Sequence, residues 1–229
     1  VMAYAYNGTN LFEETGKVDC FSTVAALYME QVQIVTTDAS IKTVADLAGK
    51  RVSIGSAGSG VYFNAIDILG AYGLTENDIV PTYQSFGDSA NDIKDGKIDA
   101  AFTVAGAPTT AIVDYATTNT LNLVSLSDDE LAAIQEAYPF LIRDDLAAGT
   151  YTGQDADVTC VAIQATLVAS EELSEDVVYE FVKAMFDNKD ALTEGHAKFG
   201  FLDPEAASAG ATVTMHPGAE KYYKEVGVL

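Results

Sequence analysis

The sequence is poor in basic residues, cysteine and histidine, and it contains no tryptophan. Its 229 residues include 12 Lys and Arg against 34 Asp and Glu, which gives a formal net charge of −22. An excess of negative charge on this scale repels phosphate backbones and anionic membrane surfaces, so we expect no nucleic-acid partner. The two cysteines and two histidines include no Cys-x-x-Cys pair and do not show the spacing of zinc ligands, and we predict no metal site.

Long apolar runs are also missing. The longest stretch without a charged residue, residues 52–66, has 15 residues and includes three glycines. A membrane-spanning helix needs about 20 apolar residues, so we expect no direct membrane insertion. The chain begins Val1-Met2-Ala3, with neither a basic segment nor an apolar run, and we expect any export signal to lie outside this sequence.

The two cysteines, Cys20 and Cys160, lie in apolar stretches. Their even number permits a disulfide, although buried reduced thiols are more typical of such positions. A catalytic pair of Cys160 with His196 or His216 would need a lowered thiol pKa, whereas an apolar strand raises it. We therefore predict no catalytic residue, no enzyme activity and no cofactor.

Strand-like and helix-like segments alternate along most of the chain, which predicts an α/β fold with mostly parallel strands flanked by helices. The pattern changes at residues 143–157, which are polar and read as a connector. Arg143 on this connector is either structural or a ligand for a carboxylate, and its loop position favours the structural role. Beyond it, strands over 158–163 and 166–169 and a helix capped by Ser174 predict a second module.

A glycine-rich turn is the sharpest local signal. A predicted strand over 51–54 leads into residues 55–60, Gly-Ser-Ala-Gly-Ser-Gly, and a predicted helix follows. Such a turn directs backbone N–H groups and the positive end of the helix dipole at an anion, with Ser59 as the N-cap. It has neither the Lys-Ser/Thr pair of a phosphate loop nor Gly-x-Gly-x-x-Gly spacing. A small carboxylate or polar ligand fits better than a nucleotide, and a purely structural turn is the alternative.

A second turn of small residues follows the predicted strand over 98–104. Its residues Gly106, Ala107 and Pro108 leave room for a ligand to approach the backbone. In open α/β sheets ligands bind beyond the carboxyl ends of the strands, so we expect both turns to face one crevice. A turn built from small residues for packing alone is the alternative.

Several motifs occur together in a characteristic order. They are Asp46-Leu-Ala-Gly-Lys-Arg-Val-Ser-Ile-Gly-Ser-Ala-Gly-Ser-Gly60, Asp95-Gly-Lys-Ile-Asp-Ala-Ala-Phe102 with Gly106-Ala-Pro108, Gly149-Thr-Tyr-Thr-Gly153, and His216-Pro-Gly-Ala-Glu-Lys-Tyr-Tyr-Lys-Glu225. Together they resemble the TAXI family, the extracytoplasmic solute-binding subunits of TRAP transporters.

The resemblance implies a two-lobed periplasmic-binding-protein fold of type II that holds glutamate, glutamine or a related small carboxylate between its lobes. It places lobe I at residues 1–38 and 150–229, without the family's N-terminal part, and lobe II at residues 39–149. An enzyme on the same fold and the effector-sensing domain of a regulator are the alternatives. The candidate ligand-binding residues are Ser56, Ala57, Gly58, Ser59, Gly60, Tyr62, Thr103, Gly106, Ala107, Pro108 and Tyr4.

Overall fold

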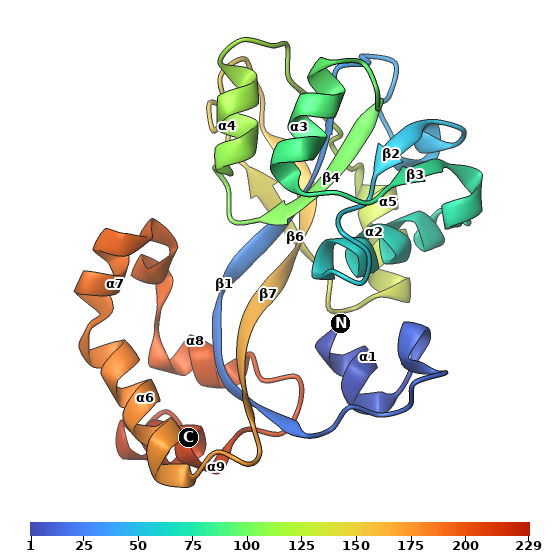
Figure 1. Cartoon of the computed structure of the whole chain (residues 1–229). Helices are drawn as coiled ribbons and strands as arrows, with labels where there is room; N and C mark the ends of the chain where they lie inside the picture. Colours follow the sequence, from blue (N-terminus) through green and yellow to red (C-terminus); the bar gives the residue numbers. More distant parts are fainter. The chain divides into compact units, whose positions relative to one another are not determined.

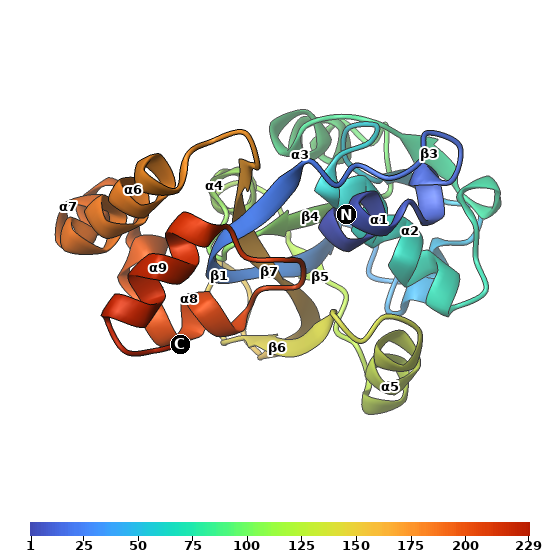
Figure 2. The same ribbon diagram turned by 90° about the horizontal axis from the view of Figure 1, so that it is seen from below.

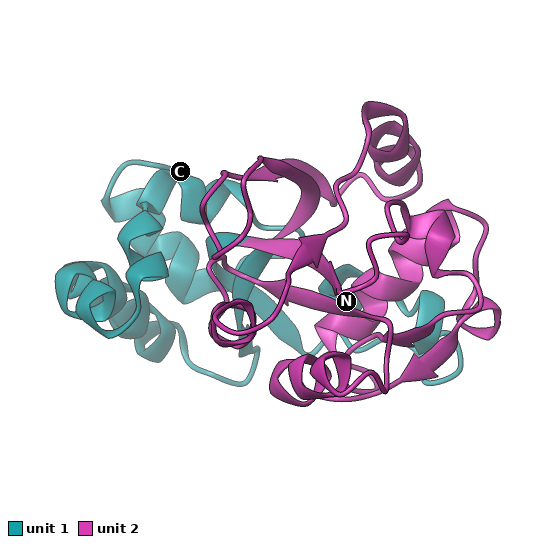
Figure 3. Cartoon of the chain, turned by 90° about the horizontal axis from the view of Figure 1, so that it is seen from above, with its two compact units in different colours: residues 1–29, 164–229 teal, residues 30–163 magenta.

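The computed structural model describes all 229 residues and divides the chain into two compact units (Figure 3). Unit 1 comprises Val1–Met29 and Gln164–Leu229, and unit 2 comprises Glu30–Ile163. Strands β1 (Phe21–Thr36) and β7 (Val158–Ser170) each run from one unit into the other. The units thus divide inside these strands, whereas the sequence places lobe boundaries after residues 38 and 149.

One mixed sheet contains all seven strands, in the order β3-β2-β4-β1-β7-β6 with β5 paired to β1. The predicted α/β class with flanking helices is confirmed (Figure 1). Parallel pairing joins β2 (Arg51–Ser53) to β3 (Val80–Thr82) and to β4 (Ala100–Ala105). Antiparallel pairing joins β1 to β4 and β5 (Asn122–Leu123), and β6 (Ile142–Leu146) to β7. The sheet therefore has fewer parallel pairs than the sequence predicted.

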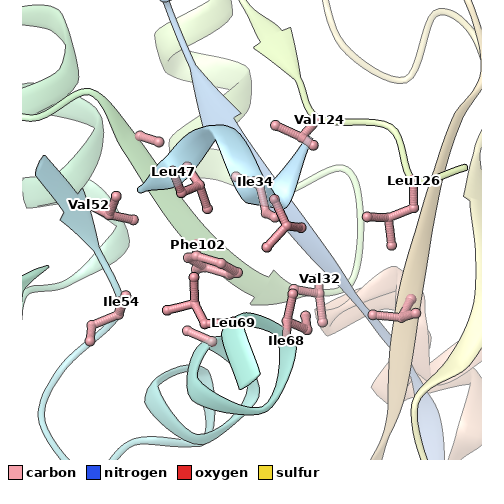
Figure 4. Close-up of a cluster of buried hydrophobic side chains, with 14 of the residues drawn as sticks. Val32, Ile34, Leu47, Val52, Ile54, Ile68, Leu69, Phe102, Val124 and Leu126 are labelled. Atoms are coloured by element: carbon pink, nitrogen blue, oxygen red, sulfur yellow. The ribbon is translucent and has the colours of Figure 1, made fainter. Parts of the chain in front are cut away.

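Unit 2 packs helices against both faces of its strands. The helical segments of this unit are η2 (Val44–Leu47), α2 (Gly60–Ala71), η3 (Glu76–Asp78), α3 (Phe86–Lys94), α4 (Thr110–Ala116) and α5 (Asp128–Ala137). Because side chains alternate across a strand, Ile34 and Phe102 join the core cluster that includes residues of α2 and α5 (Figure 4). Their neighbours Val35 and Ala101 join the cluster that includes residues of α3 and α4.

Unit 1 is mainly helical. Its helical segments are α1 (Met2–Asn7), η1 (Asn10–Phe12), α6 (Glu175–Asp187), α7 (Lys189–Gly195), η4 (Ala197–Phe201), α8 (Pro204–Ala209) and α9 (Pro217–Glu225). Helices α6 and α9 lie side by side (Figures 1 and 2). They approach so closely that a Cβ on Gly218 would lie 2.2 Å from the carbonyl oxygen of Glu175. The rings of Phe186 and Tyr222 stack between them with centroids 5.4 Å apart.

Two of the expected elements are wrong. The strands expected over 158–163 and 166–169 form one continuous strand, β7. The expected connector over 143–157 begins with strand β6, whose residues Arg143 and Asp144 pair with Val161 and Cys160. The capping predictions are confirmed, since Ser59 caps α2 and Ser174 caps α6.

The expected burial of both cysteines holds for one of them. Cys160 is buried, whereas Cys20 is exposed, and both thiols are free. Burial, with Asp144 and Asp145 nearby, raises the pKa of the Cys160 thiol to about 12, as its apolar strand predicted. None of the helices is both long enough and apolar enough to cross a bilayer.

Candidate functional site

The turn at residues 55–60 joins β2 to α2 and has a tightly constrained backbone. Gly55 has φ +80°, and a Cβ at this position would lie 2.6 Å from the Cβ of Val61. The backbone N–H of Ser59 donates to the Ser56 carbonyl at 3.0 Å, which closes the turn. The hydroxyl oxygen of Ser59 then accepts from the N–H of Tyr62 at 3.2 Å. The prediction of Ser59 as the N-cap of the helix is therefore confirmed.

This turn is open to solvent. Ser56, Ala57, Gly58 and Gly60 are exposed, and Ser59 is half-buried. The hydroxyl of Ser59 accepts one hydrogen bond and keeps its own proton for donation. Ser59 is followed by the first turn of a 12-residue helix, α2. The N-terminus of a helix carries a partial positive charge. The arrangement is suited to contact a small anion or a polar group.

The turn at residues 105–109 leaves the same edge of the sheet. Strands β2 and β4 run parallel, with Ser53 paired to Ala101, so the turns that follow them emerge beside each other. Ala107 and Gly106 are half-buried, and Pro108 is exposed. Thr103 lies within β4 and is only 3% exposed. The expectation that these turns face one crevice stays a prediction.

The amides of this second turn are partly engaged. The N–H of Ala107 donates to Oε1 of Gln31 at 2.9 Å, and the N–H of Thr109 donates to the Tyr151 hydroxyl at 2.9 Å. Sequence reasoning missed Gln31 and Tyr151, because they are separated from the turn by 76 and 42 positions. In the 105–109 turn, the N–H groups of Ala107 and Thr109 are therefore already bound by side chains of this chain.

Tyr62 is also engaged within unit 2. Its hydroxyl donates to Oε2 of Glu76 at 3.0 Å, and the Tyr83 hydroxyl donates to the other oxygen of the same carboxylate. The two tyrosine rings lie with centroids 6.2 Å apart. Burial and the Glu76 carboxylate both raise the pKa of Tyr62, so its phenol is neutral at physiological pH. Tyr83, which sequence reasoning missed, follows β3 and joins this edge of unit 2.

Both arginines are held in ion pairs. Arg51 binds both carboxylate oxygens of Asp99, at 3.0 and 2.6 Å. Arg143 contacts Asp128 at 3.0 Å and Asp145 at 3.5 Å. These contacts agree with the structural role that the sequence favoured for Arg143.

Tyr4, the last candidate ligand-binding residue, and a pocket at the end of α4 belong to neither of these two turns. Tyr4 lies on α1, in unit 1, whereas all the other candidates belong to unit 2. A pocket of unit 2 lies at the carboxyl end of α4 and is lined by residues 116–121 with Thr152 and Gly153. Sequence reasoning gave no signal for it. No group of three or more His, Cys, Asp or Glu side chains is arranged to hold a metal ion.

The structure is an α/β fold in which an exposed glycine-rich turn lies beyond the carboxyl end of a parallel strand and before the first turn of a helix, a position typical of small-ligand sites. The chain belongs to the NMT1-like family, whose model matches residues 1–227.

The solved structures that match this chain include solute-binding and transporter proteins. The periplasmic aliphatic sulphonate binding protein SsuA from Escherichia coli matches with 17% identity and a TM-score of 0.47, over 90% of this chain and 59% of that one. A putative L-cystine ABC transporter from Listeria monocytogenes matches with 18% identity and a TM-score of 0.44, over 82% and 63%. The substrate-binding protein AbpA from Streptococcus pneumoniae, bound to L-arginine, matches with 16% identity and a TM-score of 0.42, over 83% and 62%. This chain thus spans about three fifths of these proteins.

Proposed function

We propose that this chain belongs to an extracytoplasmic solute-binding protein that captures a small carboxylate or amino acid, such as glutamate or glutamine. The observation that carries the proposal is the exposed turn at residues 55–60, which combines backbone donors, the Ser59 hydroxyl and the N-terminus of α2. A carboxylate accepts hydrogen bonds from such donors and is favoured by the helix dipole. A nucleotide is a poorer fit, because the turn lacks a lysine and the net charge is −22.

The proposed partner is the membrane part of a TRAP-type transporter. The order of motifs that resembles the TAXI family supports this assignment, and membership of the NMT1-like family is compatible with it. In this scheme the protein lies outside the cytoplasm, in the periplasm or tethered to the cell surface. It binds its solute in the cleft of a two-lobed fold of type II and delivers it to the transporter.

We propose binding rather than catalysis, because Cys160 and His216, two of the residues that could form a catalytic pair, are buried within the fold. The Cys160 thiol is buried with a pKa of about 12, so it is protonated at neutral pH. The imidazole of His216 is 2% exposed, and its Nδ1 accepts from the N–H of Gly218 at 3.2 Å while Nε2 lies 3.2 Å from the Leu173 carbonyl. Neither group is arranged to attack a substrate or to move a proton for one.

A thermal-shift screen of amino acids and dicarboxylates, followed by calorimetric titration of each hit, tests this function. We expect L-glutamate, L-glutamine or a related acid to raise the melting temperature. Replacing Ser59 with alanine removes both the cap and a hydroxyl donor, and should weaken binding about tenfold.

Ser127→Ala is the matched control, because Ser127 caps α5 in the same unit and accepts from the N–H of Glu130 at 3.3 Å. Both variants should lose about 1 kcal/mol of stability, but only Ser59→Ala should lose affinity. Equal affinities in the two variants would remove the 55–60 turn from the binding site, and a screen without any hit would contradict the proposed function.

A further inference from the structure

The turn at residues 149–153 is one of the motifs in the sequence, and the ligand site proposed above does not include it. It follows β6 and directs Tyr151 into the core of unit 2, where the residue is 3% exposed. Gln154 fixes this turn from within: three backbone carbonyl oxygens share its two Nε2 hydrogens at distances of 3.0–3.2 Å, and its Oε1 accepts from the N–H of Tyr151 at 3.3 Å. The turn therefore holds Tyr151 in one place.

The hydroxyl of Tyr151 lies against the 105–109 turn. It accepts from the N–H of Thr109 at 2.9 Å and donates to Oε1 of Gln33. Gln33, which is 1% exposed, donates from Nε2 to Oγ1 of Thr109 at 3.1 Å and to the carbonyl of Ala105 at 3.4 Å. One tyrosine and one glutamine thus bind both ends of the turn.

Gln31 binds the middle of the same turn. Its Oε1 accepts from the N–H of Ala107 at 2.9 Å, and its Nε2 donates to Oδ2 of Asp144 on β6 at 2.7 Å. Gln31 and Gln33 share one face of β1, because alternate residues of a strand point to the same side. The register, which pairs Gln31 with Ala105, brings this face under the turn.

We propose that Tyr151, together with Gln33 and Gln31, is a positioning residue for ligand binding: it holds the 105–109 turn in the form that receives the ligand. The proposal rests on the proposed function and on the prediction that the 105–109 turn faces the ligand together with the 55–60 turn. Its physical basis is that a buried N–H without a partner is costly. Without the Tyr151 hydroxyl, the turn around Thr109 has to rearrange until that N–H finds another acceptor.

The test compares Tyr151→Phe with Tyr115→Phe. Tyr115 belongs to the same core cluster and is 5% exposed, but its hydroxyl contacts only the carbonyl of Thr120, at 3.4 Å. Each variant deletes one buried hydroxyl and keeps the ring. We expect Tyr151→Phe to lower the melting temperature at least as much as Tyr115→Phe, and only Tyr151→Phe should speed hydrogen exchange at the Thr109 amide, by about tenfold. The same variant should weaken binding of L-glutamate, the probe ligand, by a similar factor.

Gln31→Met provides a second variant at a half-buried position, where misfolding is a smaller risk. It removes the acceptor for Ala107 and should speed exchange at that amide. The proposal would be overturned if folded Tyr151→Phe kept the wild-type rate of hydrogen exchange at the Thr109 amide. It would also be overturned if exchange at that amide became faster while the affinity for L-glutamate stayed at the wild-type value. If the wild-type protein binds no L-glutamate, the proposed function fails for this ligand, and the exchange rates alone then decide whether Tyr151 positions the turn.

Discussion

Replacing Gly55 with alanine tests the geometry on which the 55–60 turn depends. Gly55 has φ +80°, a backbone conformation that costs an L-residue about 1–2 kcal/mol. The new Cβ would also lie 2.6 Å from the Cβ of Val61 and 3.1 Å from Oγ of Ser59, and overlap of this kind costs about 1–3 kcal/mol more. We therefore expect the free energy of unfolding to fall by about 2–5 kcal/mol.

Gly58→Ala is the matched control in the same turn. Gly58 has φ +71°, but no atom lies within 4 Å of the position that its new Cβ would occupy, so only the conformational cost of about 1–2 kcal/mol applies. Urea unfolding followed by far-ultraviolet circular dichroism measures both variants, since the chain has no tryptophan. If Gly55→Ala loses no more stability than Gly58→Ala, the close approach of Gly55 to α2 does not constrain the turn, and the reasoning is refuted.

Two further predictions concern titratable groups. Arg51 holds the pKa of Asp99 below its ordinary value through two hydrogen bonds, so the pair stabilises the fold at neutral pH and this contribution is lost as the pH falls below about 4. The free energy of unfolding of Asp99→Asn should therefore change less with acidification than that of the wild type, and equal slopes would contradict the assignment. Because Cys20 is exposed and Cys160 is buried, a thiol reagent at about pH 8 should modify Cys20 at once and Cys160 only in denaturant. Rapid modification of both thiols in the folded protein would show that β7 opens readily.

The capping residues could be predicted because their contacts are local. Ser59 binds the N–H of Tyr62, three positions away, and Ser174 binds the N–H of Val177 over the same spacing. A cap needs only the residue type and the turn geometry within a few residues, both of which a single sequence displays. The strand, turn and helix around residues 55–60 could be predicted for the same reason, because they follow one another directly in the sequence.

The strands at 142–170 could not be predicted as well, because their extent depends on partner strands. The expected break falls at Gln164 and Ala165, yet β7 continues through both residues beside the 16-residue strand β1. Backbone ladders do not need apolar side chains, so the neighbouring strand sets the length. Charged residues such as Arg143 and Asp144 made β6 resemble a loop, although charge is common on the edge strands of sheets.

Residues that lie close together in the chain specify the elements whose contacts lie within one turn: the caps, the glycine turn after β2 and the small residues after β4. Which side chains hold these turns depends on contacts between residues that are distant in the chain. Gln31 meets Ala107 across 76 positions, because the register of β1 against β4 brings them together. Tyr151, which follows β6, meets Gln33 across 118 positions. Register is a property of paired strands, and a one-residue shift would turn both glutamines to the opposite face of the sheet.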